Sequence, residues 1–173
     1  MVVGKPMFTV QQIQEKVQEL ADRISTDYEG KDLLVVCILK GAFMFASDLV
    51  RHIRVPLTMD FVLATSYVKS QSSGEIKLHC DTIEQVRDRH VLLVEDIIDT
   101  GATLNFLREH FLQRGPRSVR ICGLLNKSER RIVDVHVDYL GFNIPDAFVV
   151  GYGLDYDNKF RNLPYIAEFK QSS

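Results

Sequence analysis

The fold class of this chain is decided by the stretch Val91-Leu92-Leu93-Val94-Glu95-Asp96-Ile97-Ile98-Asp99-Thr100-Gly101-Ala102-Thr103. Its four leading residues are apolar, which is typical of a strand buried on both faces of a parallel sheet. Two adjacent carboxylates follow, then a third and a Thr-Gly-x-Thr turn that predicts the start of a helix. In an open α/β sheet, such a turn lies at the carboxyl ends of the strands, where ligands bind.

Apolar strands alternate with amphipathic helices along the rest of the chain. The predicted strands are Leu33–Leu39 and residues 57–64, 91–94, 119–125, 135–140 and 148–150. The predicted helices are a segment between Thr9, which with Gln12 resembles a capping box, and Gly30, then residues 42–53 and 103–114. Such alternation indicates an α/β fold with a mainly parallel sheet.

Two regions interrupt this alternation. Residues 66–75 carry several serines and a glycine, which predicts a loop. Residues 76–80 and 86–90 are predicted to flank a short antiparallel excursion. The loop-rich tail from Tyr152 onward is predicted to fold back with the N-terminal helix as a small cap.

The composition is typical of one globular domain. Of the 173 residues, 46% are hydrophobic and 25% charged, so a sizeable core is expected without disulfide bonds. The net charge is −2, which disfavours a nucleic-acid-coating surface. The longest apolar run, Leu33–Leu39, is too short to span a bilayer, and no signal-peptide core is visible. We therefore expect a cytoplasmic protein with reduced cysteines and with neither a membrane nor a nucleic acid as partner.

The turn after the strand combines groups that suit a phosphorylated sugar. The free N–H groups at the start of a helix suit a phosphate monoester. Because carboxylates repel a phosphate, Glu95 and Asp96 are expected to serve vicinal hydroxyls and a divalent cation. A ligand with a phosphate, a diol and a metal is a ribose phosphate. The alternative is that the acids only cap the helix; the Walker A and GxGxxG spacings are both absent.

The same stretch resembles the phosphoribosyl pyrophosphate (PRPP) binding motif of type I phosphoribosyltransferases. Leu39-Lys40-Gly41 resembles the pyrophosphate-binding loop of that family, in which the Lys40–Gly41 peptide can be cis. Ser66-Tyr67 resembles the start of its mobile catalytic loop. Lys127, residues 141–146 and residues 148–156 resemble the purine site of the short bacterial hypoxanthine-guanine phosphoribosyltransferases. Arg161 follows at the position of a pyrophosphate-contacting arginine.

The resemblance implies the type I phosphoribosyltransferase fold for the single domain 1–173. In that fold, a core of about residues 31–150 carries a twisted, mainly parallel sheet flanked by helices. A small hood is expected from the N-terminal segment and about residues 151–173. The resemblance also suggests a homodimer or homotetramer.

The implied activity is purine salvage. The enzyme would transfer the 5-phosphoribosyl group from PRPP to N9 of hypoxanthine or guanine, giving IMP or GMP and pyrophosphate, with Mg²⁺ as cofactor. Xanthine stays open as a third base, whereas Lys127 argues against adenine. The alternative is a catalytically inactive PRPP-sensing regulator of the same fold, which would have no need of a proton-transfer group.

The resemblance assigns roles around the decisive stretch. Asp99 is expected to act as general acid/base at purine N7. The residues expected at the 5′-phosphate are Asp99, Thr100, Gly101, Ala102 and Thr103. Many relatives carry a lysine at position 102, so this site must rely on backbone N–H groups. Glu95 and Asp96 are expected at the ribose hydroxyls and the first Mg²⁺.

The remaining roles fall on loops. Lys40, Gly41 and Arg161 are expected to bind pyrophosphate. Lys127 is expected to donate to purine O6, Phe148 to stack on the purine and Val149 to recognise its edge through backbone groups. Asp155 is expected beside the purine as ligand of a second Mg²⁺. The expected residues of the mobile loop are Ser66 and Tyr67.

Overall fold

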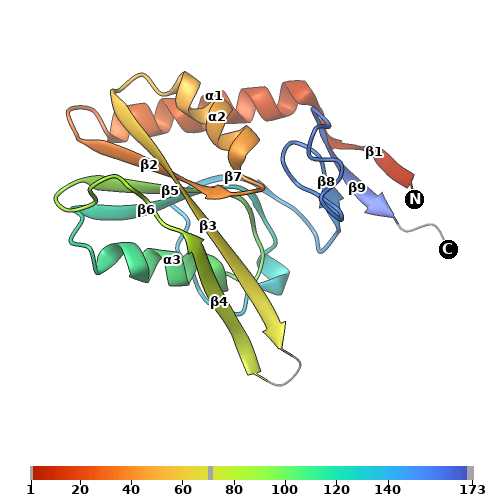
Figure 1. Cartoon of the computed structure of the whole chain (residues 1–173). Helices are drawn as coiled ribbons and strands as arrows, with labels where there is room; N and C mark the ends of the chain where they lie inside the picture. Colours follow the sequence, from red (N-terminus) through yellow and green to blue (C-terminus); the bar gives the residue numbers. More distant parts are fainter. Residues whose placement is uncertain (1, 70–71, 171–173) are drawn as a thin grey trace.

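A six-stranded sheet forms the centre of the computed structural model, which describes residues 2–69 and 72–170 (Figure 1). The strands in order across the sheet are β4 (Ser72–Cys80), β3 (Leu57–Lys69), β2 (Leu33–Leu39), β5 (His90–Ile98), β6 (Ser118–Asn126) and β7 (Tyr139–Asn143). β3 and β4 pair antiparallel, whereas the other neighbours pair in parallel. The predicted α/β fold with a mainly parallel sheet is therefore confirmed.

Helices cover both faces of this sheet. α1 (Val10–Asp27) and α2 (Phe43–His52) lie on one face, and α3 (Ala102–Leu112) lies on the other (Figure 1). The predicted capping box starts α1: the Gln12 N–H donates to Thr9 Oγ1 at 3.3 Å, and the Thr9 N–H donates to Gln12 Oε1 at 2.9 Å. None of the helices in the described part of the chain has the length and hydropathy to cross a membrane.

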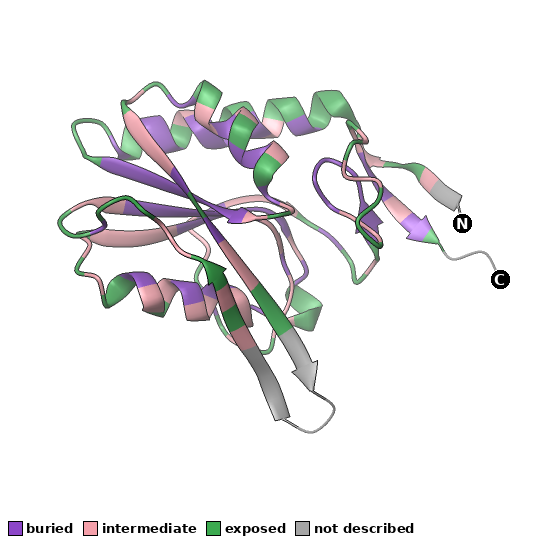
Figure 2. Ribbon diagram, in the orientation of Figure 1, coloured by how far each residue is buried: buried purple, intermediate pink, exposed green. Residues whose placement is uncertain are grey.

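The apolar strands divide the core into two layers. Successive residues of β2 point to opposite faces, so Val35 and Cys37 pack in the layer under α1 and α2, and Leu34 and Val36 pack in the layer under α3. Figure 2 shows β2 as a buried strand between the two layers. Burial on both faces explains why β2 has no polar side chain.

A second, smaller sheet contains both ends of the described chain. β1 (Val2–Phe8), β9 (Ile166–Lys170) and β8 (Val149–Val150) form it in that spatial order, with antiparallel pairing (Figure 1). The sequence predicts the N-terminal helix beside the tail. The structure instead places β1 there, because the apolar side of α1 is buried against the central sheet.

The predictions for residues 66–90 were partly wrong. β3 continues to Lys69 and β4 begins at Ser72, so residues 66–75 are not a loop; residues 70 and 71 lie outside the described part of the chain. Residues 76–80 pair with β3 and not with residues 86–90. This hairpin is paired through backbone hydrogen bonds. Its polar side chains are compatible with that pairing but give no sequence signal that predicts it. The predicted strand at 135–140 is shifted, since β7 begins at Tyr139.

Candidate active site

The two adjacent carboxylates lie within strand β5 and not in the turn after it. β5 continues to Ile98 because its backbone stays paired with β6. Glu95 is buried, with 8% of its surface exposed. Glu95 Oε1 accepts from the Asp96 N–H at 3.1 Å, and Asp96 Oδ1 accepts from the Ile97 N–H at 2.8 Å. These backbone bonds fix both side chains at the carboxyl edge of the sheet.

The electrostatics of this pair favour protonation. Burial and the charge of the neighbouring Asp96 carboxylate raise the pKa of Glu95 well above its ordinary value. Burial also raises the pKa of Asp96, and the Arg161 guanidinium offsets part of that rise. Hydroxyl donors or a cation would stabilise the two carboxylates in their ionised forms.

A pocket of about 270 Å³ lies at the turn between β5 and α3. Besides Gly101 and three aliphatic residues, its lining consists of the polar residues Ser66, Glu95, Asp99, Thr100, Thr103 and Arg130. The predicted turn residues therefore come together, with one exception. Ala102 lines a separate pocket on the side of α3 with Phe106, so its side chain is not part of the predicted phosphate site.

Glycine is required at the centre of this turn. Gly101 has a φ of 84°, and a Cβ atom there would lie 2.4 Å from the carbonyl oxygen of Val133. The N–H groups of Ile132 and Val133 both donate to the Thr100 carbonyl oxygen at 3.0 Å. The loop after β6 is thereby held against the turn. Its short 3₁₀ helix η1 (Ser128–Arg130) brings Arg130 to the pocket.

Ion pairs link four side chains of alternating charge, and two of them, Asp99 and Arg130, line this pocket. Arg130 Nε lies 3.0 Å from Asp99 Oδ1, and Arg130 Nη1 lies 3.6 Å from Asp146 Oδ1. The same Asp146 oxygen lies 3.6 Å from Lys127 Nζ. Lys127 is buried, with 7% of its surface exposed. Asp99 Oδ1 is shielded from solvent and accepts no well-aligned hydrogen bond from the described residues, so the contact with Arg130 is an ion pair without hydrogen-bond geometry.

The predicted pyrophosphate loop packs directly on Asp96. A Cβ atom at Gly41 would lie 1.7 Å from Asp96 Oδ2, so no side chain fits between them. On the other side of the loop, a Cβ atom at Gly153 would lie 2.1 Å from the Gly41 carbonyl oxygen. The cis peptide of this loop joins Leu39 to Lys40, one residue before the bond that the resemblance indicated.

The loop after β8 supplies a further ion pair. Arg161 Nη2 lies 2.7 Å from Asp155 Oδ1, and Arg161 Nη1 donates to the Gly153 carbonyl oxygen at 2.6 Å. Asp155 Oδ2 accepts from the Asn158 N–H at 2.7 Å. Contacts from Asp96 through Gly41 and Gly153 therefore reach Asp155 and Arg161. None of these residues lines the 270 Å³ pocket at the β5–α3 turn.

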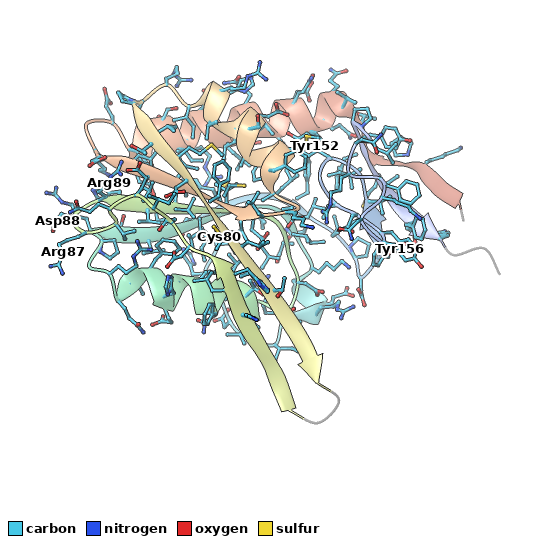
Figure 3. All side chains as sticks on the ribbon, viewed as in Figure 1. Cys80, Arg87, Asp88, Arg89, Tyr152 and Tyr156 are labelled. Atoms are coloured by element: carbon cyan, nitrogen blue, oxygen red, sulfur yellow. The ribbon has the colours of Figure 1, made fainter. Side chains whose placement is uncertain are left out.

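Phe148 and Val149, which are predicted to contact the purine, differ in exposure. Phe148 is 52% exposed, and its ring packs edge-on against Tyr156, 5.7 Å between centroids. Val149 is buried in β8. Figure 3 shows Tyr156 beside the small sheet and Tyr152 near α2, where the Tyr152 hydroxyl donates to Asp48 Oδ2 at 2.7 Å. An exposed ring on a fixed backbone is available for stacking.

The predicted mobile-loop residues lie on β3. Ser66 lines the pocket at the β5 turn, so the hairpin reaches the site from the sheet edge. Tyr67 pairs with Glu75 through the backbone, and its side chain lies outside the described part of the structure.

Comparisons with known proteins show the family of this chain. The phosphoribosyl transferase domain family matches residues 8–157. A hypoxanthine-guanine phosphoribosyltransferase of Streptococcus thermophilus is 44% identical over 170 residues, which cover 98% of this chain and 94% of the relative. The Bacillus subtilis enzyme of the same name is 44% identical over 169 residues, 97% of this chain and 94% of the relative. The chain belongs to the hypoxanthine-guanine phosphoribosyltransferase family.

A solved structure extends this result to the fold. A hypoxanthine phosphoribosyltransferase from Staphylococcus aureus superimposes with a TM-score of 0.94 at 41% identity, covering 97% of this chain and 92% of that chain. The chain therefore has the type I phosphoribosyltransferase fold and is a phosphoribosyltransferase enzyme. The catalytically inactive regulator is not favoured.

Arg130 and Asp146 are the site residues that the sequence analysis missed. Arg130 belongs to a sequence cluster of arginines that is more often a solvated surface. Asp146 ends the segment 141–146, which resembles the purine site, but it had no role of its own. The available signal was the spacing of Lys127 and Arg130, because residues three apart lie on the same side of a 3₁₀ turn.

Proposed function

We propose that this phosphoribosyltransferase acts in purine salvage and joins hypoxanthine or guanine to PRPP, releasing pyrophosphate. In this reaction purine N9 attacks C1′ of the ribose, the bond from C1′ to the pyrophosphate oxygen breaks, and the purine loses the proton on N7. The observation that carries the proposal is the position of Asp99. Its shielded Oδ1 lacks a well-aligned donor, in a pocket that also contains the start of α3.

Asp99 is proposed as the general acid/base. A carboxylate oxygen without a hydrogen-bond donor is ready to accept one, and the N7–H of a purine would supply it. The proton would move to Asp99 as N9 forms its bond. The reverse reaction would return it. Replacement of Asp99 by Asn would remove this step while keeping the shape of the side chain.

The β5–α3 turn is proposed to hold the 5′-phosphate. Thr100 and Thr103 offer hydroxyl groups, and the first N–H groups of α3 offer the positive end of the helix dipole. Gly101 permits close approach of the backbone. Because Ala102 lies on the other side of the helix start, only its backbone N–H is proposed to contribute.

Glu95 and Asp96 are proposed to bind the ribose hydroxyls and Mg²⁺. The described residues contain no cluster of three or more His, Cys, Asp or Glu side chains suited to a metal. Mg²⁺ typically takes one or two protein carboxylates and completes its shell with water and substrate phosphates, and the donor set fits that habit. When bound, the ion supplies charge neutralisation for the leaving pyrophosphate.

The second group of loops is proposed to bind pyrophosphate. The backbone at Lys40 and Gly41 and the guanidinium of Arg161 are its proposed ligands. Asp155 is a proposed ligand of a second Mg²⁺. In this structure, Arg161 and Asp155 hold each other, so an arriving magnesium pyrophosphate would give each of them a partner of opposite charge.

Lys127 is proposed to select 6-oxopurines. Its buried ammonium can donate to the O6 of hypoxanthine or guanine, with Phe148 stacking on the ring and Val149 reading its edge through the backbone. Adenine carries an amino donor at C6, which would leave the ammonium without an acceptor from the base. A buried charge that loses a partner costs several kcal/mol, which produces strong discrimination. Xanthine also carries O6 and is included among the bases to be tested.

The test is a spectrophotometric assay with PRPP and Mg²⁺ against hypoxanthine, guanine, xanthine and adenine in separate reactions. Turnover of hypoxanthine and guanine, with little or none of adenine, is the expected result. Turnover of adenine at a comparable rate would refute the role of Lys127. A lack of turnover with every base, despite PRPP binding in calorimetry, would refute the proposed function.

A further inference from the structure

Arg130 is the only cation that lines the pocket at the β5–α3 turn among the described residues. Two carboxylates, Glu95 and Asp99, line the same pocket. A phosphate monoester brings almost two more negative charges at neutral pH, whereas a helix N-terminus contributes about half a positive charge. A cationic side chain that reaches this pocket would therefore strengthen the binding of a dianion, and the turn itself supplies none.

The ion pairs of Arg130 with Asp99 and Asp146 contribute little to fixing its guanidinium in place. The contact with Asp99 lacks hydrogen-bond geometry, and the contact with Asp146 is 3.6 Å long. About half of each side chain is exposed, 48% for Arg130, 40% for Asp99 and 48% for Asp146. Although Asp99 Oδ1 itself is shielded from solvent, the Arg130 guanidinium and the Asp146 carboxylate are half exposed, so water screens much of the attraction that holds Arg130. A phosphate, in contrast, accepts two parallel N–H bonds from one guanidinium.

We propose that the Arg130 guanidinium exchanges partners when PRPP binds: it moves away from the Asp99 carboxylate and binds the 5′-phosphate. This inference rests on the proposed function and adds a residue and a switch to it. Without substrate, Arg130 shields the charge of Asp99. Once the phosphate is bound, the guanidinium moves to it, Asp146 keeps the arginine near the turn, and Asp99 becomes free to accept the purine N7–H. Arg130 is thus a phosphate-binding residue that also controls access to the general base.

The exchange predicts coupling between Arg130 and Asp99 that a structural role would not produce. In the absence of purine, Arg130→Ala is expected to weaken binding of ribose 5-phosphate by about 10- to 100-fold, as for loss of a charge-assisted hydrogen bond. Binding of inorganic pyrophosphate is expected to change less than threefold, because its proposed ligands lie on other loops. Arg130→Lys is expected to recover part of the loss. Arg108→Ala, which removes an exposed arginine paired with Glu109 on α3, is the matched control and is expected to change neither.

The deciding measurement is a double-mutant cycle by titration calorimetry with ribose 5-phosphate. Asp99→Asn removes the competitor for Arg130, so it is expected to strengthen binding more in the presence of Arg130 than in the Arg130→Ala background. Equal strengthening in both backgrounds would overturn the exchange, as would unchanged ribose 5-phosphate binding by Arg130→Ala. Hypoxanthine turnover by the unmodified enzyme is scored separately. A failure of the exchange therefore leaves the proposed function standing, whereas absent turnover refutes the proposed function alone.

Discussion

The contact between Gly41 and Asp96 makes the pyrophosphate loop sensitive to a single methyl group. In Gly41→Ala, the new Cβ would lie 1.7 Å from Asp96 Oδ2 and 2.6 Å from Asp96 Cγ. Carbon and oxygen atoms that do not bond approach to roughly 3.5 Å, so the carboxylate must retreat by about 2 Å. The φ angle of Gly41 is not in the left-handed region. The loss of stability in Gly41→Ala is therefore expected to come from the clash with Asp96 and not from backbone strain.

The magnitude follows from the bonds that hold Asp96. Retreat breaks the hydrogen bond from the Ile97 N–H, which is 2.8 Å long, and loss of such a bond to a half-buried carboxylate costs about 1.5–3 kcal/mol. For a domain of this size, a loss of 1 kcal/mol lowers the melting temperature by about 2–4 °C. Gly41→Ala should thus melt about 3–12 °C lower. Misplacement of the ribose-binding carboxylate should lower kcat/KM for PRPP by about 100-fold.

Circular dichroism melts and PRPP kinetics, repeated in an Asp96→Ala background, test this explanation. With the obstructing carboxylate removed, Gly41→Ala should lower the melting temperature by no more than about 1 °C, because the clash no longer exists. Gly30→Ala is the control, since Gly30 has a φ of 69° and nothing within 4 Å of an added Cβ. It should cost about 1 kcal/mol from backbone strain and leave the kinetics unchanged. An equal loss of melting temperature from Gly41→Ala in both backgrounds would refute the reasoning.

Three further predictions concern the charged residues of the site. Asp99→Asn should lower kcat by about 10²- to 10⁴-fold without weakening PRPP binding in calorimetry; unchanged turnover would exclude Asp99 as general base. Lys127→Ala should lower kcat/KM for hypoxanthine and narrow the preference over adenine by about 10- to 100-fold, and an unaltered preference ratio in the four-base assay would count against base selection by Lys127. Because burial raises the pKa of Glu95 above its usual 4.5, the folded chain holds a proton that the unfolded chain releases, so stability falls as pH rises above about 4.5. Glu95→Gln should therefore flatten the decline in melting temperature toward pH 8 and melt higher there than the unmodified enzyme, and parallel pH curves for the two proteins would contradict this cause.

The core strands could be predicted from sequence because burial dictates their composition. Leu33–Leu39 and the start of β5 are buried on both faces, and a strand in that position cannot carry polar side chains. The end of β5 was harder to predict. Glu95 and Asp96 interrupt the apolar run, yet the backbone stays paired with β6 as far as Ile98.

The missed features depend on contacts between distant segments. β1 contains Gly4 and Pro6, which lower strand propensity, and its pairing is supplied by β9. Arg130 is exposed and lies in a basic run. Its loop is held against the β5 turn by backbone hydrogen bonds between segments distant in sequence, from Ile132 and Val133 to Thr100 and from Lys127 to Ile98. Local sequence therefore predicted the acidic and hydroxyl groups of the site, whereas Arg130 could be placed at the site only from the fold.

The small sheet implies an order in which the parts of this enzyme fold during synthesis. Val2 pairs with Lys170 and Phe8 with Ile166, so the first strand leaves the ribosome long before its partner is synthesised. The central sheet needs only segments made earlier and can assemble while synthesis continues. The loop carrying Asp155 and Arg161 lies between β8 and β9, and the small sheet that anchors it closes last. Sequence separation this large slows closure, so a newly made chain should form its central sheet before the loop that carries Asp155 and Arg161 is fixed in place.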